Sequence, residues 1–335
     1  MKSYKICVLP GDGIGLEVIA QAVKILKVLP CEFEFTHGEI GYDTYLKDGD
    51  PLPKETIEKV GDAEATLFGA VTTPPHIPGY SSPIVRLRKE FDLYANVRPC
   101  RSLPTPLSRP DINMIIVREN TEDLYSGIER VEEEGNRAIG ERIITRKASE
   151  RIVRHAFRLA EEENFSKVTV VHKANVLRET CGLFRKVAFE IAQEFPHLTM
   201  EEMLVDACAM KIVKNPSQFQ VIVTSNMFGD ILSDEASMLV GGLGIVYSGN
   251  IGEKTAVFEP VHGSAPKYAG RNIANPIAAI MASKMMLEFL GEKDSAAIVE
   301  NAVIRAIREN KVTHDLGGNL TMEEVTRVIV KLVEK

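Results

Sequence analysis

Short apolar segments and amphipathic segments alternate along this chain from its first residues. The runs at 4–9, 65–70 and 113–118 have the length and composition of buried strands, whereas 16–26 and 147–163 place apolar residues at helical spacing. Regular alternation of strands and helices is typical of α/β proteins, in which helices cover a sheet. We therefore expect an α/β fold.

Length and charge exclude several classes of protein. The chain has 335 residues, of which 44% are apolar and 26% charged, and this predicts a soluble protein of two domains. Its net charge of -7 argues against nucleic acid or an anionic membrane as the main partner. No apolar run approaches the length of a membrane span, and the first residues lead directly into a strand rather than a signal peptide. The five scattered cysteines include no CxxC pair, so we expect reduced, structural thiols in a cytoplasmic protein.

A pair of aspartates follows the strand-like run at 219–225. If a helix starts near Gly229, Asp230 and Asp234 lie four residues apart on one helical face. Two carboxylates in this arrangement repel each other unless a cation lies between them, and hard oxygen ligands favour Mg²⁺ or Mn²⁺. A solvated acidic start of a helix is the alternative that the spacing alone leaves open.

Three arginines lie at or near the ends of predicted elements. Arg98 precedes Pro99 and therefore has an extended backbone, and Arg118 stands where an apolar run ends. Strand ends in α/β sheets collect ligands, and a guanidinium there can bind a carboxylate through two hydrogen bonds. Arg88, in a basic helical segment, is the third. Ordinary surface charge is the alternative for each.

Other strand ends carry groups that can move protons or bind cations. Tyr125 and Lys173 both follow predicted strands, and either can act as a general acid or base when its pKa is lowered. Packing and solvation are the simpler interpretations of these two side chains. Asp206 ends another run and is a candidate metal ligand, or else a helix cap.

Two glycine-containing loops are candidates for nucleotide binding. The turn at 11–15 fails the GxGxxG pattern of a Rossmann fold, because the last glycine would have to stand where Leu16 is found. The loop at 259–266 is dense in Gly and Pro around His262, and backbone amides in such a loop can bind phosphate groups.

Five motifs in order along the chain resemble the β-decarboxylating dehydrogenases of 2-hydroxy acids, the family of isocitrate, 3-isopropylmalate and homoisocitrate dehydrogenases. They are LRKEFDLYANVRP, VRENTEDLY, HKANVL, NMFGDILSDEAS and EPVHGSAPKYAGRNIANP. The resemblance implies a two-lobed fold with a mixed sheet flanked by helices, distinct from a Rossmann fold. Residues 1–99 and 254–335 would form a dinucleotide-binding lobe, and 100–253 a lobe for dimerisation, metal and substrate. It further implies a homodimer with a shared active site, with a tetramer as an alternative.

The resemblance assigns roles residue by residue. The acid–base pair would be Tyr125 with Lys173 of the partner subunit, and the metal ligands Asp230 and Asp234 with Asp206 of the partner subunit. The implied substrate contacts are Ser82, Val85, Arg88, Arg98, Arg118, Tyr125, Lys173, Asn175 and Asp206. The implied cofactor contacts are Thr72, Asn175, His262, Gly263, Ser264, Ala265, Lys267 and Asn275. A non-catalytic regulatory subunit would have lost part of this set, and the chain keeps all of it.

Substrate and cofactor remain open within the family. Isocitrate enzymes have Ser-x-Asn at the positions of Ser82 and Ile84, and here the second is Ile. The segment Ser-Pro-Ile-Val-x-Leu-Arg at 82–88 most resembles homoisocitrate dehydrogenases of lysine biosynthesis. We therefore expect homoisocitrate as the substrate first, isocitrate second and 3-isopropylmalate third. Lys267 stands where NAD-dependent relatives usually have Asp, and a lysine suits the 2′-phosphate of NADP. A second NADP cluster is not evident near 312–315, so NAD is the first expectation and NADP the alternative.

Overall fold

The computed structural model describes residues 3–74, 77 and 80–335, and the chain divides into two compact units. The first unit runs to Leu93, takes up Leu103–Pro110 and resumes at Val240, whereas the second comprises Tyr94–Ser102 and Asp111–Leu239. The boundaries between the two lobes expected from the sequence were after residues 99 and 253 instead. The difference arises because 95–101 pairs with 113–119 of the second unit, and 247–251 pairs with 256–260 of the first.

Among its described residues, the first unit contains five strands in the order β2-β1-β3-β12-β11. The first four are mutually parallel, and β11 is antiparallel to β12. The strand bounds are β1 Ser3–Gly11, β2 Glu32–His37, β3 Ala65–Ala70, β11 Tyr247–Ile251 and β12 Ala256–Pro260. The helices are α1 Ile14–Leu26, α2 Tyr42–Asp48, α3 Lys54–Asp62, α4 Pro83–Glu90, α9 Ile277–Phe289, α10 Lys293–Arg308 and α11 Met322–Val333. The apolar helix α9 is buried against α1, α10 and the strands.

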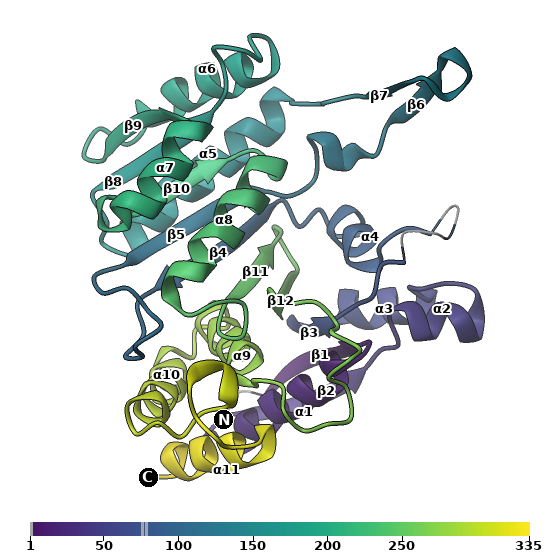
Figure 1. The fold of residues 1–335 in the computed structure, drawn as a ribbon, viewed down its shortest axis with the longest axis vertical. Coiled ribbons are helices and arrows are strands. Elements are labelled where there is room, and N and C mark those ends of the chain that lie inside the picture. The colour runs from purple at the N-terminus through teal and green to yellow at the C-terminus, as the bar shows by residue number, and fades with distance from the viewer. Residues whose placement is uncertain (1–2, 75–76, 78–79) are drawn as a thin grey trace. The chain divides into compact units, whose positions relative to one another are not determined.

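The sheet of the second unit contains five strands in the order β4-β5-β10-β8-β9, in which β4 is antiparallel to β5 and the others run parallel. Their bounds are β4 Ala95–Arg101, β5 Asn113–Glu119, β8 Lys167–His172, β9 Thr199–Leu204 and β10 Val221–Thr224. Helices α5 Arg146–Glu162 and α6 Thr180–Ala192 cover one face, and α7 Val205–Lys214 and α8 Asn226–Val240 the other (Figure 1). This distribution follows from right-handed crossovers, because the chain reverses direction across the sheet after β9. Strands β6 Glu129–Glu132 and β7 Arg137–Gly140 form a separate hairpin.

The parallel strands of the second unit place several candidate residues along one edge. Strands β5, β8 and β10 end at Glu119, His172 and Thr224, and the chain continues from these ends into 120–125, 173–175 and 226–234. The carboxyl ends of parallel strands in α/β sheets are where ligands bind. The order of the strands therefore brings these three segments to the same edge of the sheet.

Helix α8 begins earlier than the sequence predicted. It starts at Asn226 rather than near Gly229, because the carboxylate of Asp123, from a distant segment, accepts a hydrogen bond from the amide of Met227 at 3.2 Å. Asp230 and Asp234 consequently both lie within the helix, as their spacing predicted. The prediction of free cysteines is also confirmed, with four of the five buried. Over the described ranges, no helix is long and apolar enough to cross a membrane.

Candidate active site

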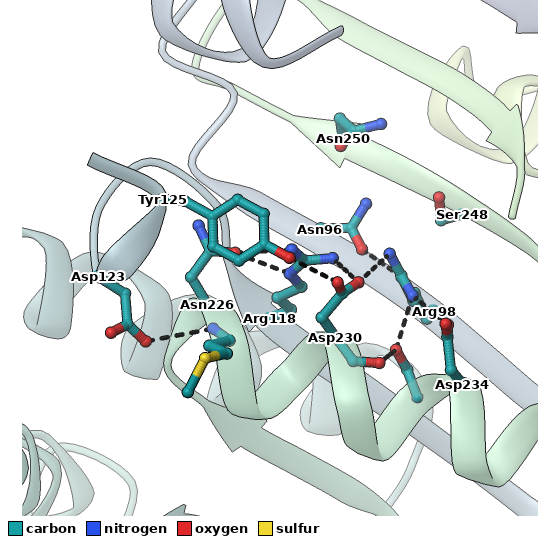
Figure 2. A network of polar contacts seen from close by, with 12 residues as sticks. Asn96, Arg98, Arg118, Asp123, Tyr125, Asn226, Asp230, Asp234, Ser248 and Asn250 are labelled. Atoms are coloured by element: carbon teal, nitrogen blue, oxygen red, sulfur yellow. Dashed lines mark hydrogen bonds and ion pairs between the residues drawn. The ribbon is translucent and has the colours of Figure 1, made fainter. Parts of the chain in front are cut away.

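Arg98 and Arg118 point to the same carboxylate on α8. Arg98 pairs with Ile116 in the β4–β5 register, so Arg118 is its diagonal neighbour on the same face of the sheet. Arg98 Nη2 donates to Asp230 Oδ1 at 3.2 Å, and Arg118 Nη1 donates to the same oxygen. Both guanidinium side chains are deeply buried, with 8% and 2% of their surface exposed. Figure 2 shows the two arginines on either side of Asp230.

Each arginine is held by uncharged groups as well. Arg118 donates from Nε and Nη2 to Asn226 Oδ1 at 2.9 and 2.7 Å. Arg98 donates from Nε to Asn96 Oδ1 at 2.6 Å and from Nη1 to Ser233 Oγ at 2.7 Å. These contacts fix the planes of both guanidinium groups, which is the preorganisation that binding a carboxylate requires.

Tyr125 completes this group. Its hydroxyl donates to Asp230 Oδ2 at 2.6 Å, and its ring lies 5.0 Å from the guanidinium carbon of Arg118 (Figure 2). Burial, together with the hydrogen bond to Asp230, raises the pKa of Tyr125. The phenol therefore carries its proton at neutral pH and is a proton donor in this arrangement.

Asp230 and Asp234 offer hard oxygen ligands on successive turns of α8. Arg98 Nη1 donates to Asp234 Oδ1 at 3.0 Å, so one guanidinium contacts both carboxylates. Burial and the charge of Asp230 raise the pKa of Asp234, and a divalent cation would relieve that repulsion. Within the part of the chain that the structure describes, no three His, Cys, Asp or Glu side chains are grouped to hold a metal ion. The two carboxylates are oxygen donors of the kind that Mg²⁺ or Mn²⁺ binds.

Gly229 allows α8 to pack directly on Arg118. A Cβ at this position would lie 2.7 Å from Cβ and Cγ of Arg118, closer than real side chains approach. The glycine of the NMFGD motif is therefore required by the close approach of helix and arginine, not by its backbone angles.

Lys173 and Asp206 form a second pair in the same unit. Lys173 Nζ donates to Asp206 Oδ1 at 2.5 Å, and this hydrogen bond lowers the pKa of Asp206. Asp206 lies in the first turn of α7, and Asn175 is exposed beyond the end of β8. Their role in the site of a partner subunit stays a prediction.

Arg88 belongs to the first unit and is held there by its own partners. Its Nε donates to Asn250 Oδ1 at 3.0 Å, and its Nη2 donates to Glu259 Oε1 at 3.2 Å. Asn250 Nδ2 in turn donates to the same Glu259 oxygen at 2.7 Å. Val85 lies three residues before Arg88, so the two side chains are neighbours on the surface of α4, and Ser82, six residues before Arg88, is the N-cap of this helix.

The predicted nucleotide-binding residues cluster around the loop at 261–265. Thr72 Oγ1 and Ser264 Oγ are 2.7 Å apart, and Ile14 N donates to the carbonyl of Ser264 at 2.9 Å. Burial lowers the pKa of His262, and its Nε2 atom is buried without a hydrogen-bond partner among the residues described. A neutral imidazole with an unused nitrogen suits a ligand such as a nucleotide. Asn275 donates to Asp315 Oδ2 at 2.9 Å, Gly263 and Lys267 are exposed, and Ala265 has a φ of 38°.

Several residues that build these groups were not singled out from the sequence. They are Asn96, Asn226 and Ser233 around the arginines, Asn250 and Glu259 around Arg88, and Asp12, whose Oδ2 accepts from Thr72 N at 2.7 Å. Four of them stand inside motifs that carry the family resemblance. For Asn96 the available signal was a short polar residue two positions from Arg98, and the others approach their partners only through the fold.

Comparison with known proteins places this arrangement in a family. A model described as isocitrate/isopropylmalate dehydrogenase matches residues 5–332. The 3-isopropylmalate dehydrogenase of Methanothermobacter thermautotrophicus is 51% identical over 335 residues, which is 100% of both chains. The homoisocitrate dehydrogenase of Methanocaldococcus jannaschii is 49% identical over 99% of this chain and 98% of that protein. The crystal structure of isocitrate dehydrogenase from Methylococcus capsulatus superposes with a TM-score of 0.94, at 43% identity, over 99% of this chain and 100% of the other.

These matches define an α/β dehydrogenase that oxidises and decarboxylates its substrate. The chain belongs to the isocitrate/isopropylmalate dehydrogenase family and is an NAD(P)-dependent β-decarboxylating dehydrogenase. The resemblance drawn from the five motifs and the predicted fold class are therefore confirmed. The names of the relatives divide among three substrates, so the matches do not select one.

Proposed function

We propose that the protein catalyses the oxidative decarboxylation of a 2-hydroxy-3-carboxy acid with NAD and Mg²⁺ or Mn²⁺, most favourably homoisocitrate to 2-oxoadipate. Isocitrate is the second candidate and 3-isopropylmalate the third. The observation that carries the proposal is the convergence of Arg98 and Arg118 on Asp230, where the Tyr125 hydroxyl also lies. Two buried guanidinium groups suit an anionic substrate. The proton donor beside them suits a reaction whose last step protonates carbon, and the acidic pair suits a divalent cation.

The arginines bind the substrate in this proposal. Arg98 and Arg118 keep their contacts with Asn96 and Asn226 and exchange part of their pairing with Asp230 for substrate carboxylates. Arg88, fixed by Asn250 and Glu259, is the third guanidinium group assigned to a substrate carboxylate. A divalent cation at Asp230, Asp234 and the partner subunit's Asp206 would supply Lewis-acid polarisation of the substrate hydroxyl and stabilise the enolate charge.

Two side chains move the protons. Lys173 of the partner subunit takes the proton of the substrate hydroxyl, and a bound NAD or NADP would accept the hydride from the carbon that bears this hydroxyl, which would leave a β-keto acid. The bond to the carboxylate carbon then breaks, CO₂ departs, and the electron pair remains on the substrate as an enolate. Tyr125, which carries its proton at neutral pH, donates that phenolic proton to the enolate carbon. Substrate and products balance with one hydride and one CO₂.

Helix α4 supports a polar substrate side group. Val85 lies one turn before Arg88 and Ser82 caps the start of α4, whereas Ile84 packs against the apolar core that includes Leu87 and Leu93. Among Ser82, Val85 and Arg88, only Val85 is apolar, so an isopropyl group on the substrate would gain little hydrophobic binding energy here. This arrangement favours homoisocitrate or isocitrate over 3-isopropylmalate.

A homodimer is part of the proposal because α7 and α8 expose apolar side chains. Met210 and Val213 of α7 are 70% and 44% exposed, and Ile231 and Met238 of α8 are 58% and 66% exposed. Large apolar groups at helical spacing on two elements of one face favour burial against another chain. The same helices carry Asp206 and the Asp230–Asp234 pair, so this pairing would bring residues of two subunits to one site.

The test is reduction of nicotinamide by a panel of acids. Purified protein with Mg²⁺ and NAD or NADP is given homoisocitrate, isocitrate and 3-isopropylmalate, and absorbance of the reduced cofactor is recorded alongside CO₂ release. The proposal expects the highest kcat/KM with homoisocitrate and NAD. Highest kcat/KM with 3-isopropylmalate would contradict the proposed substrate, and no reduction with any of the three would contradict the proposed reaction.

A further inference from the structure

His172 is the last residue of β8 and immediately precedes Lys173. Its side chain is only 4% exposed, and it belongs to none of the residue sets proposed to bind substrate, metal or cofactor. A buried histidine at a strand end commonly has only a packing role. Its hydrogen bonds point to a more specific one.

The two ring nitrogens of His172 have different partners. The backbone amide of Ala174 donates to Nδ1 at 3.2 Å, and Nε2 lies 3.3 Å from Glu202 Oε2. A backbone N–H can only donate, so Nδ1 must be unprotonated, and the ring proton is on Nε2, where it is donated to Glu202. The contacts therefore select one neutral tautomer.

This tautomer shapes the turn that carries Lys173. An acceptor that binds the amide two residues further on closes a tight turn, as Asn and Asp side chains do in Asx-turns. On the other side, Val176 N and Leu177 N donate to the carbonyl of Lys173 at 3.0 and 2.9 Å. The backbone of Lys173 is thus fixed from both directions, and its Nζ reaches Asp206 from that fixed position.

Glu202 and Arg185 hold the ring in turn. Glu202 lies on β9, where Leu204 pairs with His172, and Arg185 of α6 donates from Nη2 to Glu202 Oε1 at 2.9 Å. The Arg185 pairing keeps Glu202 ionised as an acceptor for Nε2–H, since it lowers the pKa of Glu202. Burial lowers the pKa of His172, which keeps the imidazole neutral as this arrangement requires.

We propose that His172 is a positioning residue whose Nδ1 atom, as a hydrogen-bond acceptor, sets the turn that places Lys173 for proton transfer. This inference rests on the proposed acid–base role of Lys173. It makes no claim that His172 touches substrate. The property of His172 that matters for the site is the hydrogen-bond acceptor at Nδ1, not the volume or the charge of the ring.

Two substitutions separate the acceptor from the space that the ring fills. His172→Leu retains an apolar side chain of similar volume without an acceptor, whereas His172→Asn supplies Oδ1 to the amide two residues on. We expect His172→Leu to lower kcat by about 10- to 100-fold, the scale of a misplaced catalytic group, and His172→Asn to stay within about threefold of wild type. The matched control Glu201→Gln, on the same strand, removes a carboxylate that pairs with Lys167 instead of His172, and it should also stay within about threefold.

Melting temperatures of all variants show whether they fold, and Lys173→Met is assayed in parallel. If Lys173→Met keeps wild-type turnover, the proposed role of Lys173 fails, and the His172 proposal fails with it. If Lys173→Met is inactive while His172→Leu is fully active, only the His172 proposal is overturned. Equal loss in His172→Leu and His172→Asn also overturns it, because the acceptor would then not matter.

The tautomer can be tested independently of activity. In protein labelled with ¹⁵N-histidine, the chemical shifts distinguish a protonated from an unprotonated ring nitrogen, and His172→Asn identifies the signals of this residue among the seven histidines. We expect an unprotonated Nδ1 and a protonated Nε2. A proton on Nδ1 would overturn the proposal even if the activities followed the expected pattern.

Discussion

The hydroxyl of Tyr125 donates a hydrogen bond to Oδ2 of Asp230 across 2.6 Å. The proposed proton donor and a proposed metal ligand are thus in direct contact within one chain. Oδ1 of Asp230 accepts hydrogen bonds from Arg98 and Arg118, and Oδ2 accepts the one from the phenol. The tyrosine is consequently oriented before any substrate binds.

Replacement of Tyr125 by Phe should impair the last chemical step more than the first. The phenyl ring keeps the packing on Arg118 but has no proton to give to the enolate carbon. We expect steady-state turnover to fall by about 10²- to 10⁴-fold, the usual contribution of a general acid, while the first turnover still yields reduced nicotinamide. Stopped-flow absorbance compared with product release measures both. Tyr94→Phe, at an aromatic residue of the same unit that contacts His155, is the control; unchanged turnover in Tyr125→Phe would rule out the role.

Gly229→Ala should damage the site without unfolding the protein. The added methyl group would meet Arg118 at 2.7 Å, so the arginine must move away from Asp230 or α8 must shift. We expect kcat/KM to fall at least about tenfold, which corresponds to about 1.4 kcal/mol of lost transition-state binding. Gly182→Ala is the matched control, because a Cβ on this α6 glycine meets nothing within 4 Å. That control should keep its activity and gain up to about 1 kcal/mol from helix propensity.

The aspartate pair and the arginine pair differ in how far the sequence predicts them. The spacing of Asp230 and Asp234 is a local property of a helix, so it could be predicted as soon as a helix was expected. The convergence of Arg98 and Arg118 depends on the β4–β5 register, which pairs Arg98 with Ile116. That register is set by pairing between distant segments and is not visible in either segment alone.

The same distinction explains where the predicted helix start was wrong. Local composition placed the start of the helix near Gly229, whereas Asp123 accepts the amide of Met227 and allows α8 to begin at Asn226. Asp123 lies about a hundred residues earlier in the chain, so no local pattern contains this cap. Asn226 then faces Arg118 and becomes part of the site.

His155 should make the stability of the protein sensitive to pH on the acid side. Burial and the charge of Arg158 lower the pKa of His155 to about 4. The unfolded chain takes up a proton near the usual pKa of about 6.5, and the folded chain does not until much lower pH. The contribution of this residue is therefore fully present above about pH 6.5 and declines as pH falls toward 4, by about 1–2 kcal/mol at pH 5.

Urea denaturation of wild type and His155→Gln at pH 7.5 and pH 5 measures this contribution. The variant should lose less stability between the two pH values than wild type does. His197→Gln, at an exposed histidine paired with Glu161, is the control and should follow wild type. Parallel curves for wild type and His155→Gln would show that His155 titrates normally in the folded protein.

Asp234→Asn should weaken metal dependence more than folding. Asp234 contributes a carboxylate that is 57% exposed, so its loss removes a ligand charge with little effect on packing. We expect the Mg²⁺ concentration for half-maximal rate to rise at least about tenfold, while the melting temperature stays close to wild type. Glu235→Gln, at the neighbouring acidic residue of α8, should leave the Mg²⁺ dependence unchanged. An unaltered Mg²⁺ titration in Asp234→Asn would refute the metal assignment.

Lys267→Asp should shift cofactor choice further toward NAD. The exposed lysine follows the loop that carries His262 and Ser264, and a negative charge there would repel the 2′-phosphate of NADP. We expect the ratio of kcat/KM with NAD to kcat/KM with NADP to rise at least about tenfold, a difference of about 1.4 kcal/mol. Lys267→Ala separates loss of attraction from added repulsion and should give an intermediate ratio. If all three proteins show the same ratio, Lys267 does not contact the region of the cofactor that distinguishes NADP from NAD.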